Sequence, residues 1–432
     1  MSSVITLVDC NNFFVSCERA IDPSLNNKPV AVLSNNDGCI IARSNEVKAL
    51  GIPMGAPVFK WKKFLEQKNV ILLSCNFALY GSMSQKVMDT LGHFTPDIEY
   101  YSVDEAFLDF TNVAITNLQE YGLKIRTTVW ETTKIPVSIG IATTKTLSKI
   151  ATDLAKHDPQ LEGVLNLTNC RNIDHYLAQV DIGAVWGVGR RLAKLFLAYN
   201  ILNARDLKYI DHNHIRKLTS VMCERTVLEL NGIVCHPVNK RPEPNKTIAC
   251  TRTFKHMQEN YHTLAQAVAN YAVDVAERLR RQHSLAGQIL TFITTNYHHR
   301  ELPQYHNAQV VKLPKASNFS PRIIAAALKA LNKIFKQGYK YKRAGVIASG
   351  ITSDKQEQLE LFPESTENQR AKEQRLMEMV DQINSRLGHN LVKFGTLPLT
   401  TSRKQLSTIK TKENAPFIIR KTELYTIKLG GG

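Results

Sequence analysis

An acidic pair inside an otherwise apolar run, YSVDEAFLD at residues 101–109, is the feature that most constrains this chain. We expect residues 98–110 to form one strand. Neighbouring residues on a strand point to opposite faces, so Asp104 and Glu105 cannot both be ordinary surface residues if one face is buried. Charge placed there costs stability unless a cation neutralises it. The pair therefore predicts a functional site, with two solvated acids as the simpler alternative.

A second apolar run opens the chain and ends in a carboxylate. Residues 4–8 read as a strand that stops at Asp9, and the segment CNNFF at residues 10–14 turns away. Asp9, Asp104 and Glu105 are therefore expected to meet at one edge of a sheet. Hard oxygen ligands of this kind suit Mg²⁺, and two such ions form a clamp for phosphoryl transfer. Taken alone, Asp9 is more simply a solvated strand end or a helix cap.

Composition restricts the partners and the compartment. The 432 residues imply several domains, and the net charge of +17 favours a polyanionic partner, either nucleic acid or an anionic membrane surface. No apolar stretch is long enough to span a bilayer, and no secretory signal is visible. The eight cysteines show no Cys-x-x-Cys spacing, which argues against a zinc site and favours a reduced, cytoplasmic chain.

The first part of the chain alternates strands and helices, which is typical of an α/β or α+β catalytic domain. Its last expected helix carries Lys145, Lys149 and Lys156 on or near one side. The expected elements are a strand and short helix within 1–25, strand 28–33, helix 44–50, helix 78–93, strand 98–110, helix 117–133, strand 137–141 and helix 144–156.

Residues 170–232 are expected to be helical with short breaks. One break contains Gly187 and Gly189 and leads directly into Arg190 and Arg191. Glycines let backbone N–H groups turn outward at a helix start, where phosphate binds well. The pattern has the form of a helix-hairpin-helix that holds a DNA backbone, and a plain turn between packed helices is the alternative.

The proline-rich segment 236–246 reads as an extended basic linker. After it we expect a small α+β domain with helix 263–283, strand 288–295 and helix 321–337. Its basic residues, among them Arg280 and Arg343, favour a continuous binding surface. The pattern then loosens, and residues 353–375 are expected to be flexible at first.

A short apolar motif stands within that loose segment. Gln358, Leu359, Leu361 and Phe362 are isolated among polar residues, which indicates a docking peptide rather than part of a core. The last sixty or so residues are expected to form a small helical and irregular tail.

These motifs occur in the order seen in Y-family DNA polymerases, and the chain resembles that family over nearly its whole length. The resemblance rests on Asp9 with Phe13 and Phe14, the acidic strand, the SIGIA segment at residues 138–142 with the lysine helix, and the hairpin after Ile182. The segment SNNDGC at residues 34–39, the docking peptide and the tail resemble UmuC-type catalytic subunits of DNA polymerase V, including plasmid- and mobile-element-borne relatives.

The resemblance implies an α+β multidomain, right-hand fold with a palm, small fingers, a helical thumb with the helix-hairpin-helix, and a little finger. Short fingers imply low fidelity and tolerance of damaged templates. The implied domains are palm 1–25 and 76–165, fingers 26–75, thumb 166–235, linker 236–246, little finger 247–352, and clamp-binding peptide with C-terminal tail 353–432.

The resemblance also implies the metal and sugar sites. Asp9, Asp104 and Glu105 match the catalytic metal ligands, assisted by the Cys10 carbonyl, and two Mg²⁺ ions are expected. Phe14 matches the steric gate that rejects ribonucleotides, in a position that is Tyr in many relatives. Phe13 beside it is included with the substrate-binding residues.

For the triphosphate, Lys156 matches a palm lysine and Lys48 falls where many relatives place an Arg. Lys is a point charge rather than a bidentate fork, so contact with less geometric control is expected. Arg43 is a nearby alternative, and Asn45 departs from a triphosphate-binding Tyr of many relatives.

The implied reaction is attack of a primer 3′-hydroxyl on a dNTP in SOS-type damage tolerance, on a primer-template DNA. The implied partners are the sliding clamp, bound through Gln358–Phe362, a processed UmuD-like dimer and a RecA filament. Two other classes remain open from the residues: a non-catalytic DNA-binding regulator derived from a polymerase, and a nuclease or other metal-dependent phosphotransferase.

Overall fold

The computed structural model describes residues 3–239, 243–355, 367–387, 392 and 394. They form two compact units, one that runs up to Asn239 and one that starts at Glu243. Each unit has its own buried core.

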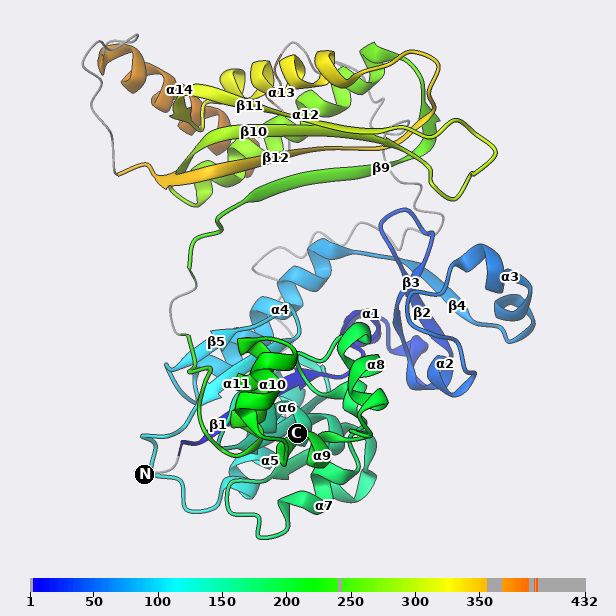
Figure 1. The fold of residues 1–432 in the computed structure, drawn as a ribbon, viewed down its shortest axis with the longest axis vertical. Helices are drawn as coiled ribbons and strands as arrows, with labels where there is room; N and C mark the ends of the chain where they lie inside the picture. Colours follow the sequence, from blue (N-terminus) through cyan, green and yellow to red (C-terminus); the bar gives the residue numbers. More distant parts are fainter. Residues whose placement is uncertain (1–2, 240–242, 356–366, 388–391, 393, 395–432) are drawn as a thin grey trace, which may run out of the picture. The chain divides into compact units, whose positions relative to one another are not determined.

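A five-stranded sheet in the order β5-β6-β1-β7-β8 organises the first unit. The central strand β1 pairs antiparallel with β6 and with β7. Helices α1, α4 and α5 share an apolar core with one face of this sheet, and α6 packs across β1 and β7 (Figure 1). The bounds are β1 Ile5–Cys10, α1 Phe13–Ile21, α4 Phe77–Gly92, β5 Ile98–Tyr100, β6 Glu105–Asp109, α5 Leu118–Thr133, β7 Val137–Ala142, α6 Lys145–His157 and β8 Val164–Asn166.

The expected single strand over residues 98–110 is wrong. The segment forms two antiparallel strands, β5 and β6, with Ile98 opposite Leu108 and Tyr100 opposite Ala106. Both Tyr101 and Ser102 donate their backbone N–H to the Glu105 carbonyl at 3.1 Å. Asp104 therefore lies in a turn, which we call the acidic hairpin (residues 98–109), and only Glu105 begins a strand.

Residues 26–75, the predicted fingers, contain a small sheet in the order β3-β2-β4. It packs against two helices around a separate apolar cluster that includes Ile40, Val47 and Leu65. The bounds are β2 Val30–Leu33, β3 Ile40–Arg43, α2 Asn45–Ala49, α3 Val58–Gln67 and β4 Ile71–Ser74.

Short helices make up residues 170–232, as the sequence pattern predicts. Their apolar residues share one core with α6 and with β8. The bounds are α7 Ile173–Ala178, α8 Arg190–Ala198, α9 Ala204–Lys208, α10 His212–Leu218 and α11 Val221–Leu230, with a 3₁₀ turn at Ile182–Ala184.

The first residues of the predicted linker pack on the first unit instead of forming a free strap. Val238 contacts Ile5, Leu7 and Phe107 on β1 and β6. The backbone N–H of Asn239 donates to a Glu99 carboxylate oxygen. We refer to residues 235–239 as the docked strap.

A four-stranded antiparallel sheet in the order β11-β10-β12-β9 forms the second unit, with α12 and α13 on one face (Figure 1). Both helices were expected, but of the four strands only β10 was. The bounds are β9 Ile248–Gln258, α12 Tyr261–Arg281, β10 Ser284–Thr295, β11 His306–Ser317, α13 Ser320–Ile334 and β12 Tyr341–Ser353.

A further helix, α14 (Glu367–Leu387), packs on the second unit. Arg280 on α12 holds it with two bonds to the Asp381 carboxylate, at 2.6 and 2.8 Å. Arg322 on α13 pairs with Glu373 at 2.9 Å, and Met377 is buried. The expectation that residues 353–375 are flexible is therefore wrong from Glu367 onward, and Arg280 stabilises this helix rather than belonging to an open basic surface.

We expect Arg280→Ala to loosen α14 by about 1–3 kcal/mol, because a charge-assisted bidentate pair is lost and Asp381 is left without its partner. Hydrogen exchange of the α14 amides should accelerate accordingly. Arg281→Ala is the matched control, since its ion pair with Glu277 is largely exposed and should contribute little. Equal exchange rates in the two variants would contradict the proposed role of Arg280.

Candidate active site

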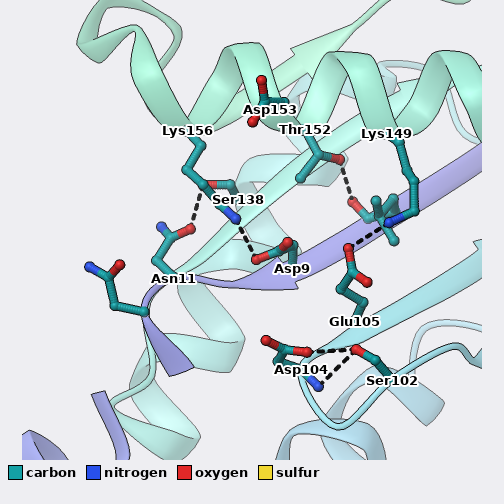
Figure 2. A network of polar contacts seen from close by, with 12 residues as sticks. Asp9, Asn11, Ser102, Asp104, Glu105, Ser138, Lys149, Thr152, Asp153 and Lys156 are labelled. Atoms are coloured by element: carbon teal, nitrogen blue, oxygen red, sulfur yellow. Dashed lines mark hydrogen bonds and ion pairs between the residues drawn. The ribbon is translucent and has the colours of Figure 1, made fainter. Parts of the chain in front are cut away.

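Three carboxylates gather where β1 ends and β6 begins, at the turn of the acidic hairpin. Asp9 and Glu105 are direct cross-strand partners. The backbone N–H of Cys10 donates to the Asp104 carbonyl at 2.8 Å, which fixes the hairpin against the end of β1. Figure 2 shows the three acids at this edge of the sheet. The register thus places the three acids together although Asp104 is not part of a strand.

Two lysines of α6 neutralise two of these acids. Lys156 Nζ donates to Asp9 Oδ1 at 2.6 Å, and Lys149 Nζ donates to Glu105 Oε1 at 2.8 Å. The lysines are two helical turns apart and so share a face of α6; both reach the acids from that helix in Figure 2. Each acid side chain is only 17% exposed, and the cations offset the cost of burying it.

The close approach of α6 to the sheet depends on Gly140 of β7. A Cβ atom at this position would lie 2.2 Å from the Ser148 carbonyl oxygen and 2.3 Å from the Thr152 nitrogen. Ser148 Oγ in turn donates to the Ile5 carbonyl at 2.7 Å. The missing side chain therefore lets the lysine helix lie directly on the strands that carry the acids.

The third acid is oriented differently. Asp104 Oδ1 accepts from Ser102 Oγ at 2.6 Å within the acidic hairpin. Across the described ranges, no group of three His, Cys, Asp or Glu side chains is arranged to hold a metal ion. The oxygen chemistry of the three acids suits Mg²⁺, and the bond from Ser102 orients the Asp104 carboxylate within the hairpin turn.

The surroundings raise the pKa of two groups at this edge. Burial raises the pKa of Asp9 to about 6, although Lys156 acts in the opposite direction. Burial also raises the pKa of the Cys10 thiol well above its usual range, so the sulfur stays protonated. The Cys10 thiol therefore adds no negative charge beside the acids.

Three of the predicted triphosphate-binding cations influence one another. The pKa of Lys48 is lowered by desolvation first, and then by the charges of Lys156 and Arg43. Arg43 donates one guanidinium N–H to the Ile52 carbonyl, and its Nε is buried without a partner. Gathered cations that repel one another form a receptive site for an anion. Asn45, at the neighbouring helix start, accepts a bond from Asn12 at 2.9 Å.

The two phenylalanines after β1 have different environments. Phe13 is 3% exposed within the core, so its side chain packs there and is not placed to contact a substrate. Phe14 is only partly buried; its ring stacks on Tyr80 at a centroid distance of 4.5 Å and meets Phe77 edge-on. Phe14 is thus held rigidly while part of it stays accessible.

The predicted helix-hairpin-helix forms a tight turn before α8. Gly187 adopts a left-handed φ of +89° that favours glycine, and Gly189 caps the helix. Arg190 and Arg191 follow in the first turn and are exposed. The predicted clamp-binding residues Gln358, Leu359, Leu361 and Phe362 lie outside the described residues.

Sequence reasoning missed the partners of the lysines. Lys145 pairs with Glu99 at 2.5 Å and Lys149 with Glu105, so two of the three α6 lysines bind the acidic hairpin. The spacing of lysines on one side of the helix was visible in the sequence. The acids that they meet could be assigned only once α6 was known to cross the sheet.

Comparisons with known proteins give the class. Residues 8–153 match the impB/mucB/samB family, and residues 245–361 match the impB/mucB/samB family C-terminal domain. The chain is 40% identical to the protein UmuC of Salmonella typhimurium, over 90% of this chain and 93% of that protein. It is 27% identical to DNA polymerase IV of Bacillus velezensis, over 91% of this chain and 93% of that protein.

The fold agrees with these matches. A Y-family DNA polymerase chimera of Dbh and Dpo4 superposes with a TM-score of 0.65 at 23% identity, over 81% of this chain and 99% of that one. The fold is that of a Y-family DNA polymerase. The chain belongs to the impB/mucB/samB family, to which its similarity to UmuC also points.

Membership makes this chain a DNA-directed DNA polymerase that acts on DNA and deoxynucleoside triphosphates and depends on a divalent metal. In the part of the chain that the structure describes, no helix is both long and apolar enough to cross a membrane. All eight cysteines are described, and none is in a disulfide.

Proposed function

We propose that this protein is an error-prone translesion polymerase subunit that works in SOS-type damage tolerance and mutagenesis in the cytoplasm. The observation that carries the proposal is the cross-strand pair of Asp9 and Glu105 with Asp104 beside it, set under the lysine face of α6. A polymerase relic without activity would have no reason to keep all three acids together. The small fingers sheet favours a weak test of base-pair shape.

Asp9, Asp104, Glu105 and the Cys10 carbonyl would hold two Mg²⁺ ions. Bound there, the ions would supply Lewis acidity and charge for the developing oxyanions of phosphoryl transfer. The protein's own contribution is positioning and electrostatics. Ser102 orients the Asp104 carboxylate, and the partly buried Asp9 and Glu105 are oriented by their lysines.

The triphosphate would lie against Lys156, Lys48 and Arg43. Their mutual repulsion is relieved when an anion binds between them, which favours a polyphosphate over a neutral ligand. Asp9 and Lys156 would then separate as the lysine turns toward phosphate oxygens. The base-independent nature of these contacts fits a polymerase that accepts all four nucleotides.

The primer-template DNA would be held through its backbone by the turn at Gly187 and Gly189 and by Arg190 and Arg191. Outward N–H groups at the start of α8 suit a phosphate. We further propose docking on the sliding clamp through Gln358–Phe362, and cooperation with a processed UmuD-like dimer and a RecA filament. These partners follow from similarity to UmuC and from the sequence motif.

The test is primer extension on undamaged and lesion-containing templates with Mg²⁺ and dNTPs. The chain should be assayed alone, and with a UmuD-like partner and a RecA filament. Extension past the lesion supports the proposal. Degradation of the DNA without dNTPs would instead favour a nuclease, and silence with partners present and DNA binding intact would favour a non-catalytic regulator.

Phe14→Ala should weaken selection against ribonucleotides. Removing the ring opens space where a 2′-hydroxyl would clash, so the ratio of ribonucleotide to deoxynucleotide incorporation should rise tenfold or more, on the order expected for one steric group. Single-nucleotide insertion kinetics measure the ratio. Phe59→Ala, which removes an exposed ring on α3, is the control, and an unchanged ratio in both variants would contradict the role of Phe14.

A further inference from the structure

An aromatic cluster joins the acidic hairpin to the thumb turn. Trp186, the residue before Gly187, donates its indole N–H to the Tyr101 hydroxyl at 3.1 Å. Its ring meets the Tyr101 ring edge-on at 5.8 Å and lies 6.4 Å from the buried Phe107 ring. The only residues between this tryptophan and α8 are the predicted DNA-binding glycines and Val188. The cluster is therefore a direct physical contact between a DNA-binding turn and the hairpin that carries the acids.

The same rings hold the lysine that pairs with Glu105. Lys149 Nζ lies 4.7 Å from the Tyr101 ring centroid and 5.9 Å from that of Trp186. It also donates to Glu105 Oε1 at 2.8 Å. A cation over an aromatic face is attracted by the ring quadrupole. The ammonium group thus contacts one carboxylate and two rings. A displacement of either ring would therefore change the positions of the Lys149 and Glu105 side chains.

The docked strap also contacts the aromatic cluster. The His236 ring meets Trp186 edge-on at 5.7 Å. The backbone N–H groups of Cys235 and His236 donate to Glu229 Oε1, and Thr146 at the start of α6 donates to the other oxygen of this buried carboxylate. Trp186 therefore contacts the acidic hairpin, α6 and the docked strap, so a shift of the thumb turn would displace side chains in all three.

We propose that Trp186 is a positioning residue that couples backbone binding of DNA at the thumb turn to the placement of Glu105, through Tyr101 and Lys149. The inference rests on the proposed function, because it assigns Glu105 to the catalytic edge. DNA bound at Gly187 and Gly189 holds Trp186 in place; Trp186 holds Tyr101 and Lys149; and Lys149 orients Glu105. Tyr101 and Trp186 touch neither nucleotide nor metal in this scheme.

Deleting the indole–hydroxyl bond from either side tests the coupling. Tyr101→Phe removes only this bond, whereas Trp186→Phe removes it and also replaces the indole ring near Lys149 with a smaller one. Each should lower kcat by about fivefold, the effect of one hydrogen bond, with the primer-template Kd unchanged within about twofold. Because both changes delete the same bond, the double variant should be no slower than Trp186→Phe alone.

Trp130→Phe is the matched control for these variants. Trp130 is a half-exposed tryptophan on α5 that also lies under a lysine, Lys134, at 5.9 Å. It should leave kcat unchanged. Additive losses in the double variant, or unchanged kcat in both single variants, would overturn the coupling. Losses confined to thermal stability or DNA affinity would show that Trp186 is only a packing residue.

A second readout needs no catalysis. In a protein with Trp61→Phe and Trp130→Phe, Trp186 is the only tryptophan, so its fluorescence can be followed by itself. Lys149→Met should alter its emission without DNA or metal, whereas Lys134→Met should not. An unchanged spectrum with Lys149→Met would overturn the inference. If the wild-type protein fails to extend primers but this spectral change is seen, the proposed function fails while the contact between Trp186 and Lys149 stands.

Discussion

Replacing Asp104 by alanine should reduce nucleotide addition about a thousandfold or more while primer-template binding persists. Loss of one carboxylate from a metal-dependent phosphoryl-transfer site costs several kcal/mol of barrier, at about 1.4 kcal/mol for each decade of rate. Single-turnover insertion of one dNTP measures the rate, and fluorescence anisotropy of labelled primer-template measures the binding.

Of the three acids, Asp104 is the one whose removal disturbs the fewest other contacts. Asp9 and Glu105 each pair with a lysine, so their removal leaves a half-buried cation unpaired. The Asp104 side chain bonds to Ser102 in the hairpin turn, and its link to Cys10 uses the backbone carbonyl, which alanine keeps. Glu131→Ala, at an exposed position on α5, is the control. Full activity of Asp104→Ala would remove this residue from the catalytic edge.

Replacing Gly140 by alanine should unfold the first unit at a markedly lower temperature. The new methyl group would overlap the Ser148 carbonyl and the Thr152 nitrogen of α6, and backbone atoms cannot rotate away. Overpacking of this kind costs about 3 kcal/mol or more. For a unit of this size, that corresponds to a fall in Tm of about 6–12 °C. Thermal unfolding followed by circular dichroism measures it.

The matched control for Gly140 is Gly81→Ala. Gly81 lies on the exposed side of α4, where an added Cβ meets nothing within 4 Å. Alanine is the better helix former, so this variant should gain up to about 1 kcal/mol. An equal response of the two variants would mean that α6 can move away from the sheet at little cost.

The gathering of the three acids at one edge of the sheet could be predicted because its signal is local. Asp9 stands at the end of a short apolar strand, and Glu105 starts another, so strand pairing alone brings them opposite each other. The cations that neutralise them come from a helix placed by tertiary packing. Lys149 and Lys156 could be recognised as lying on one face, but their acid partners depend on how closely Gly140 lets α6 approach.

The turn of the acidic hairpin could not be predicted from its sequence. Tyr101, Ser102 and Val103 lack the glycine or proline that marks most tight turns, and two of them favour strands. The turn is instead closed by two N–H groups that converge on the Glu105 carbonyl. An unbroken strand was therefore the natural prediction, and it misplaced Asp104 by assigning it to the sheet.

The second unit was underpredicted for a different reason. Strands β9, β11 and β12 carry many polar residues, since only one face of their sheet is covered by helices. Alternation in such strands is easily mistaken for a polar connection. Helix α14 is also strongly polar. Its attachment depends on Arg280, which the sequence analysis placed on a basic binding surface, and on Arg322, which it did not single out.

The attachment of α14 has a consequence for how the second unit unfolds. Asp381 on α14 is bound to Arg280 of α12, and Glu373 is bound to Arg322 of α13. Because its partners lie on two different helices, α14 should lose its packing as soon as α12 and α13 separate from each other. Exchange of its amides would therefore report on the integrity of that helix pair, at a distance from the sheet.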